Sequence, residues 1–186
     1  MRRERQHESV RLAFSGAVCA LLVVAFCALS LWGCGGAQFD GVEYSDKDVA
    51  FRLGPTPPGM HRLQSDDARI AMQNDGAGST MAIGARCNQD SDDVPMRALV
   101  QHLFLQFEDR QIISEREFVL DGRTALRTEL LARLDGVRRH FIVVVMKKDD
   151  CVYDFLHVDG GGDGPLLRQS RADFDRMIDG VVVLRP

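Results

Sequence analysis

Residues 117–146, which read EFVLDGRTALRTELLARLDGVRRHFIVVVM, decide the fold of this chain. Two Asp-Gly pairs, Asp121-Gly122 and Asp135-Gly136, separate runs that are rich in apolar and β-branched residues. An Asp-Gly pair between such runs is a strong signal for a β-hairpin. The run Phe141–Met146 is apolar at every position, which is typical of a central strand covered on both faces. The segment therefore predicts an antiparallel meander.

The alternation of side chains predicts the register of both hairpins. Across the second Asp-Gly pair, a two-residue loop keeps one face apolar by setting the following residues opposite each other: Leu126 and Val145, Thr128 and Val143, Leu130 and Phe141. Across the first pair, such a loop would set Glu117 beside Leu126. A three-residue loop puts Phe118 near Thr124 instead, and we expect this register because it keeps the face apolar.

Shorter elements flank the meander. Period-two alternation predicts strands at residues 49–53, 68–73, 80–87, 151–158 and 181–184. Apolar residues at helical spacing predict a helix over residues 95–109, with Pro95 in its first turn and Asp92 or Asp93 as its cap. A last helix is expected to begin at Ser170, where Asp173 completes a capping box. Its buried face would contain Phe174, Met177 and Ile178.

This order of elements resembles the PsbP-like fold over residues 42–184. The resemblance is carried by residues 49–53 (VAFRL) with the Gly/Pro-rich segment after them, the turn Leu120–Ala125 and the ending Phe174–Val183. Pro58-Gly59-Met60 stands where the family commonly has a Pro-x-x-Trp type element. The resemblance implies an α+β domain, in which two main helices pack on an antiparallel sheet of about six to seven strands. It also implies a non-enzymatic binding or accessory module.

The beginning of the chain predicts export and anchoring. An Arg-rich segment, residues 2–11, precedes the apolar run 12–33, which is long enough to span a bilayer core as a helix. The end of this run, Leu31-Trp32-Gly33-Cys34, resembles the lipobox of bacterial lipoprotein precursors. That resemblance implies that a lipid, such as a palmitate, is attached to Cys34 and that cleavage occurs before it. The alternative is an uncleaved signal anchor with the same topology.

We therefore expect a lipoprotein signal peptide at 1–33, a short tether at 34–41 and a single α+β domain at 42–186. A tether of about seven residues spans no more than about 25 Å, so the domain should lie close to a membrane of the cell envelope and face the periplasm. Gly35 is not the Asp that favours retention in the inner membrane in some bacteria, and the outer membrane is therefore favoured.

Charge and cysteine content narrow the possible functions. The chain has a net charge of −4 and the signal segment is basic, so the mature part is acidic and does not fit a nucleic-acid surface. Cys19 and Cys27 belong to the apolar run, which leaves Cys87 and Cys151 as a pair in an oxidising compartment. They are either joined by a disulfide, which would contribute roughly 4 kcal/mol, or remain two buried thiols.

Candidate catalytic and metal-binding residues are few. His61, His102, His140 and His157 lie outside the signal segment, and they do not have metal-ligand spacing in the sequence. His157 shares a strand face with Cys151, but about 20 Å of strand would separate them and exclude a nucleophile pair. The acidic stretches 90–93 and 159–164 do not match an EF-hand loop. We expect the first to lie at the start of the helix and residues 160–164 to form a solvated loop. A Ser-His-Asp arrangement stays open, although the chain contains no Gly-x-Ser-x-Gly elbow.

The sequence therefore predicts a lipid-anchored, non-enzymatic module that binds an envelope protein, without catalytic residues, metal, cofactor or nucleic acid. The alternatives are a small-ligand pocket between sheet and helix and, with less support, an uncharacterised hydrolase.

Overall fold

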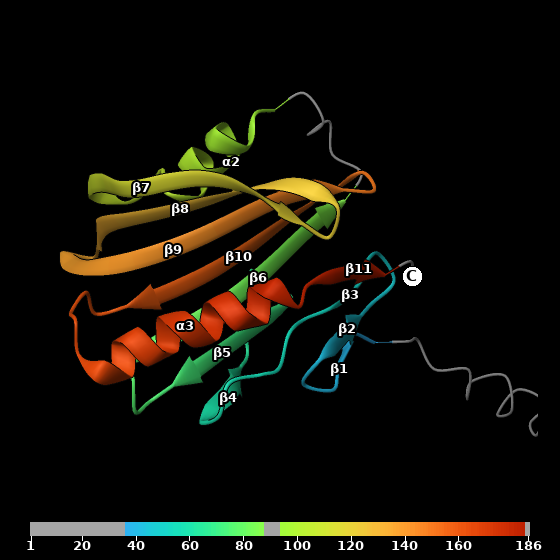
Figure 1. Cartoon of the computed structure of the whole chain (residues 1–186), viewed down its shortest axis with the longest axis horizontal. Helices are drawn as coiled ribbons and strands as arrows, with labels where there is room; N and C mark the ends of the chain where they lie inside the picture. The colour runs from blue at the N-terminus through green and yellow to red at the C-terminus, as the bar shows by residue number, and fades with distance from the viewer. Residues whose placement is uncertain (1–35, 88–93, 185–186) are drawn as a thin grey trace, which may run out of the picture. The chain divides into compact units, whose positions relative to one another are not determined.

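Seven antiparallel strands form the central sheet of the domain (Figure 1). The structure, a computed structural model, describes residues 36–87 and 94–184. The strands lie in the order β4-β5-β6-β10-β9-β8-β7, so β7 and β4 form its edges. Their bounds are β4 Met60–Leu63, β5 Ile70–Asn74, β6 Ser79–Cys87, β7 Glu108–Leu120, β8 Arg123–Leu134, β9 Val137–Lys148 and β10 Cys151–Asp159.

A second antiparallel sheet contains four short strands in the order β1-β2-β3-β11. Their bounds are β1 Gln38–Phe39, β2 Glu43–Ser45, β3 Ala50–Arg52 and β11 Val182–Leu184. The first and last described strands thus belong to the same sheet, and Figure 1 shows it beside the end of α3. Phe51 of β3 contacts Tyr153 of β10 edge to face, with 6.1 Å between ring centroids, and this pair joins the two sheets. Such pairs contribute about 0.5–1.5 kcal/mol beyond their buried area.

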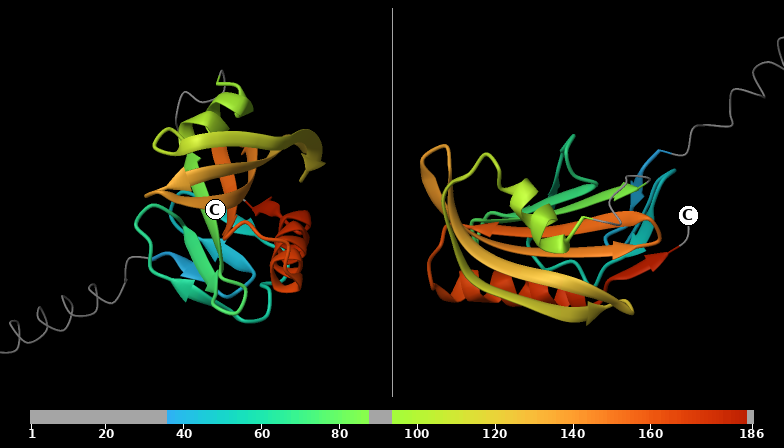
Figure 2. Two further views of the ribbon diagram at one scale, coloured as in Figure 1. Left: turned by 90° about the vertical axis from the view of Figure 1, so that its left-hand side faces the viewer. Right: turned by 90° about the horizontal axis from the view of Figure 1, so that it is seen from above.

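Two helices within the described residues cover opposite faces of the central sheet (Figures 1 and 2). The helix α2 (Met96–Leu103) packs on β8 and β9, whereas α3 (Pro165–Asp179) packs on β6 and β10. Strand β9 contributes to the apolar clusters on both faces of the sheet, because successive side chains of a strand point to opposite faces. Its odd-numbered residues 141–145 belong to the apolar cluster under α2, and its even-numbered residues 142–146 belong to the cluster under α3. We call these two sides the α2 face and the α3 face.

The predicted fold class is confirmed, since two helices pack on antiparallel sheets. The strand predicted at 151–158 is confirmed by β10, and the apolar run 141–146 lies in the central strand β9. Across Asp135-Gly136, the register is the expected one, with Thr128 opposite Val143. The sequence did not indicate β1, β2 and β4, which are edge or small-sheet strands of at most four residues.

The register predicted for the first hairpin is wrong. Asp121 and Gly122 form a two-residue loop with positive φ at both positions (46° and 73°), and Glu117 does lie opposite Leu126. The reason is the position of β7 at the edge of the sheet. Most of its side chains are exposed, so Glu117 remains in solvent although its partner Leu126 is buried. An apolar face therefore does not have to continue onto an edge strand.

Both helices have bounds that differ from the prediction. The helix α2 ends at Leu103 and not at 109, because the chain turns there and brings Phe104 and Phe107 against Phe141. The helix α3 begins at Pro165 and not at Ser170, since proline fits the first turn of a helix. Phe174, Met177 and Ile178 form its buried face, as expected. The expected caps Asp92 and Asp93 lie outside the described residues.

The described chain already has strand pairing before residue 42. Gln38 and Phe39 of β1 pair with Ser45 and Tyr44 of β2, within the segment expected to be a tether. None of the helices in 36–87 and 94–184 is both long and apolar enough to cross a membrane.

Candidate functional site

An apolar groove of about 410 Å³ lies between α2 and strands β7 and β8. It is lined by Arg97, Val100, Gln101, Phe104, Leu105, Arg110, Ile112, Glu115, Thr128 and Leu130. Helix α2 supplies one wall because its apolar residues recur at helical spacing, and β8 supplies the floor because its even-numbered residues point to this face. This volume is at the lower end of the range of small-molecule sites.

The mouth of the groove exposes apolar side chains to solvent. Leu105, in the turn after α2, is 64% exposed, and Ile112 of the edge strand β7 is 55% exposed. Apolar side chains that gather at the entrance of a concave apolar site are typical of a surface that binds something.

The floor of the groove contains a buried hydroxyl group without a partner. Thr128 is 1% exposed, and among the described residues its Oγ1 has no hydrogen-bond partner. The alternation of β8 places this polar residue between the apolar Leu126 and Leu130 on the α2 face. Leaving a buried hydroxyl unpaired costs about 1–3 kcal/mol, so Thr128 lowers the stability of the α2 face.

Charged residues at the rim differ in how they are paired. Arg97 of α2 binds Glu115 of β7 through two contacts, from Nη2 to Oε2 at 2.6 Å and from Nε to Oε1 at 3.1 Å. Arg110 of β7 donates from Nη1 to the backbone oxygen of Phe104 at 3.2 Å. Within residues 36–87 and 94–184, the Arg110 guanidinium has no carboxylate partner. Its remaining N–H groups can donate to an anion.

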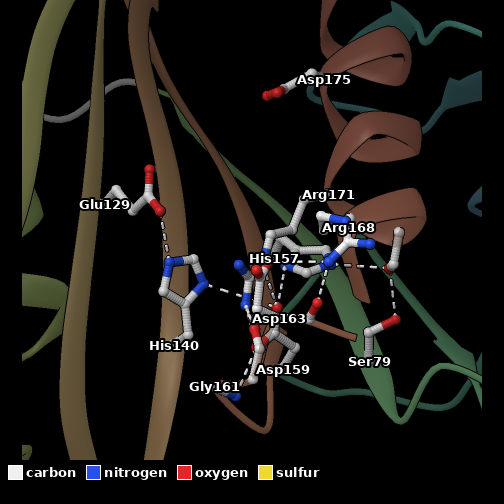
Figure 3. Close-up of polar contacts among 12 residues, drawn as sticks. Ser79, Glu129, His140, His157, Asp159, Gly161, Asp163, Arg168, Arg171 and Asp175 are labelled. Carbon is white, nitrogen blue, oxygen red and sulfur yellow. Dashed lines mark hydrogen bonds and ion pairs between the residues drawn. The ribbon is translucent and has the colours of Figure 1, made fainter. Parts of the chain in front are cut away.

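On the α3 face, in contrast, polar side chains form a buried network (Figure 3). His140 of β9 lies between Glu129 of β8, with Nε2 and Oε1 2.7 Å apart, and Asp159 of β10, with Nδ1 and Oδ2 3.7 Å apart. The pairing of β8, β9 and β10 brings them together, since Glu129 lies opposite Ile142 and His140 lies opposite Asp159. His140 and Asp159 are 4% and 0% exposed.

Asp159 is stabilised as a carboxylate in the centre of this network. Arg171 of α3 donates from Nε to Oδ2 at 2.7 Å and from Nη2 to Oδ1 at 3.1 Å, and the N–H of Gly161 donates to Oδ1 at 2.7 Å. Burial raises the pKa of Asp159, but polar contacts with His140, Arg171 and Gly161 outweigh it and hold that pKa below the ordinary value. Glu129 behaves similarly, because contacts with His140 and Arg127 outweigh the effect of burial and lower its pKa.

His157 connects this network to α3. Its Nε2 lies 2.9 Å from Oγ of Ser170, and that hydroxyl lies 2.7 Å from Oγ of Ser79 on β6. Burial is the main reason that the pKa of His157 falls from 6.5 to about 4, so the imidazole is neutral at pH 7. Its ring packs on Phe174, with 5.6 Å between centroids.

Ser170, His157 and Asp159 therefore come together, although the sequence left this arrangement open. They do not form an accessible nucleophile. The distance from His157 Nδ1 to Asp159 Oδ2 is 3.9 Å, which is too long for a hydrogen bond. Ser170 is 4% exposed and its hydroxyl already contacts Ser79, so α3 would have to leave the sheet before a substrate could reach it.

The other predicted site residues are spread over the molecule. The structure joins Cys87 and Cys151 by a disulfide, since these residues lie directly opposite each other in β6 and β10. His61 and His102 are exposed. Asp159 accepts a hydrogen bond from Arg171. The described residues contain no group of three or more His, Cys, Asp or Glu side chains arranged to hold a metal ion. Cys34 and the stretch 90–93 lie outside the described residues.

Sequence reasoning missed the groove residues Thr128 and Arg110 as a pair, and it missed Ser170 as a partner of His157. A signal for Thr128 was available, because it is a polar residue within the apolar alternation of β8. The contact between Ser170 and His157 depends on where α3 begins. An N-terminus at Pro165 turns Ser170 into an interior helix residue that faces the sheet.

Comparison with known proteins supports the fold. Neither protein-family models nor curated proteins match the chain. The solution structure of cyanobacterial PsbP (CyanoP) from Synechocystis superimposes with a TM-score of 0.53 at 14% identity, covering 83% of this chain and 99% of that one. LpqN of Mycobacterium tuberculosis gives 0.51 at 15% identity, covering 81% and 90%. The domain therefore has a PsbP-like fold.

Proposed function

We propose that this protein is a lipid-anchored lipoprotein of the cell envelope, whose domain is a non-enzymatic binding or accessory module for a partner near the membrane. The observation that carries the proposal is the apolar groove under α2 with Leu105 and Ile112 exposed at its mouth. The polar groups of the α3 face are largely buried beneath the helix, whereas the groove is open to solvent and offers apolar surface to a partner. LpqN, which shares the fold, is described as involved in cell envelope biogenesis.

The beginning of the fold supports a position at the membrane surface. Gly35, Gly36 and Ala37 are all that separates Cys34 from Gln38, the first residue of β1. With a lipid on Cys34, a chain segment of this length reaches no more than about 14 Å. The domain would then lie against the periplasmic surface of the membrane, with the outer membrane favoured.

The groove also favours a second candidate, a lipoprotein that binds a small ligand. Its volume of about 410 Å³ and its apolar walls suit a small molecule as well as a side chain of a protein partner. A hydrolase gains no support from Ser170, because that hydroxyl is buried between α3 and β6.

The proposal is tested with the full chain in its own membrane. Metabolic labelling with a palmitate analogue should label the wild type but not Cys34→Ala, and Cys34→Ala should leave the membrane fraction or accumulate as precursor. An unlabelled wild-type chain that stays in the membrane would favour the uncleaved anchor.

Partner binding is tested by crosslinking intact envelopes and purifying the chain after solubilisation. A double variant, Leu105→Glu with Ile112→Glu, should lose the crosslinked partner and remain folded, because both side chains are exposed. Val119→Glu is the matched control, since Val119 is a 76% exposed residue of the same strand that does not line the groove. Identical crosslinks for all three proteins would contradict a binding role of the groove.

A further inference from the structure

The groove under α2 combines two features. Its walls are apolar, and its rim contains the guanidinium of Arg110. From this combination we infer that the groove binds a single unesterified hydrocarbon chain through its ionised carboxylate, that is, a medium-chain carboxylate such as dodecanoate. This inference rests on the proposed role of the groove as a binding site.

The apolar walls select a hydrocarbon chain. Val100 of α2, Phe104 directly after the helix and Leu130 of β8 line the groove together. Leu105 and Ile112 extend this surface to the solvent. A water molecule has a share of about 30 Å³ in the liquid. If a methylene group takes a similar volume, about a dozen carbon atoms fill the groove, which suits one medium-length chain and not two.

The charges of the rim select an anionic head group. Arg97 is neutralised by its two contacts with Glu115. Arg110 keeps its charge without a carboxylate partner in the described part of the chain, and only its contact with the Phe104 oxygen holds it at the groove. A guanidinium group fits a carboxylate through two parallel hydrogen bonds, which a neutral alcohol cannot accept.

The experiment uses the full chain in phospholipid vesicles and a photoreactive dodecanoate analogue with a diazirine on its chain. After irradiation, peptides from α2, β7 and β8 should be labelled. Dodecanoate should compete at about tenfold lower concentration than 1-dodecanol, a difference that corresponds to about 1.4 kcal/mol. Arg110→Gln should remove this difference. Arg123→Gln, at an exposed arginine of β8 that does not line the groove, should leave the difference unchanged.

Several results would overturn the inference. These are labelling confined to other peptides, equal competition by dodecanoate and dodecanol in the wild type, and the same loss in Arg123→Gln as in Arg110→Gln. Labelling of the groove by a photoreactive phosphatidylglycerol that dodecanoate does not displace would assign the site to a membrane lipid. The crosslinked envelope partner is measured separately, so a groove that rejects dodecanoate but retains that partner would refute the ligand and leave the proposed function standing.

Discussion

The α2 face and the α3 face of the central sheet differ in the contacts that their buried polar groups make. On the α3 face, Asp159, His140 and Arg171 are buried or half-buried but contact one another, and the helix seals them. On the α2 face, the buried Thr128 hydroxyl has no partner among the described residues, and an open groove lies next to it. A buried carboxylate that is held by a guanidinium and a backbone N–H stabilises a fold, whereas an isolated buried hydroxyl without a partner costs free energy. The following predictions test this difference.

The largest effect is expected for the ion pair in the α3 network. Arg171→Met would leave the Asp159 carboxylate buried without its guanidinium partner, and breaking such a pair costs about 3–5 kcal/mol of unfolding free energy. Urea unfolding of the two proteins measures this loss. Arg168→Met is the matched control, because Arg168 is on the same helix but its side chain is 58% exposed. If both variants unfold at the same urea concentration, the network does not stabilise the domain.

The disulfide at the other end of the α3 face should have the next largest effect. Cys87 and Cys151 are 64 residues apart in the chain, so their bond restricts the unfolded state. Replacing both with serine should lower the free energy of unfolding by about 4 kcal/mol in the chain-entropy model. A reducing agent should shift the urea midpoint of the wild type in the same direction and should not affect the double variant. A wild type that does not respond to reduction would mean that the two thiols are free in solution.

The third prediction concerns pH and His157. Its pKa is about 4 in the folded protein and 6.5 in the reference state, so the unfolded chain binds the proton first as the pH falls. The contribution of the neutral His157 imidazole to the free energy of unfolding is complete above pH 6.5. It is lost progressively down to pH 4, by up to about 3 kcal/mol. Asp159 on β10, His140 on β9, Arg127 on β8 and Arg171 on α3 are the charged or titratable neighbours that act on this group.

The lowered pKa values of Asp159 and Glu129 act in the same direction, since their stabilisation is lost when these carboxylates are protonated in acid. Urea midpoints measured from pH 7.5 to pH 4 follow the effect. His157→Gln should flatten the profile between pH 6.5 and 4, while His61→Gln, at an exposed histidine, should leave it unchanged. A wild-type profile that is flat in this range would show that His157 is not buried in the neutral form.

The smallest effect is expected on the α2 face. Thr128→Val keeps the shape of the side chain and removes the unpaired hydroxyl, so the melting temperature should rise, with a gain of about 1 kcal/mol. Thr124→Val on the same strand is the control, because Thr124 is exposed and should show no gain. A loss of stability in Thr128→Val would mean that the hydroxyl has a partner, and the contrast between the two faces would then disappear.

Much of the framework could be predicted because it depends on local patterns. Asp-Gly pairs specify tight turns, and the apolar alternation of β8 and β9 fixes their register once both strands are interior. The same argument failed at β7, where exposure at the edge removes the constraint on Glu117. The predicted start of α3 was also wrong, because Pro165 and the capping-box residues around Ser170 gave competing signals for the first turn of the helix.

The sequence by itself determined the order of the strands in the meander, the buried face of α3 and the pairing of residues across the second turn, because these follow from periodicity and turn chemistry over short distances. Only the tertiary structure decided which polar residues meet. Glu129, His140, Asp159 and Arg171 come from three strands and a helix, and their contacts depend on the packing of α3 over β10. The groove, likewise, exists because α2 ends at Leu103 and the chain turns back along β7, which leaves Thr128 beneath an opening.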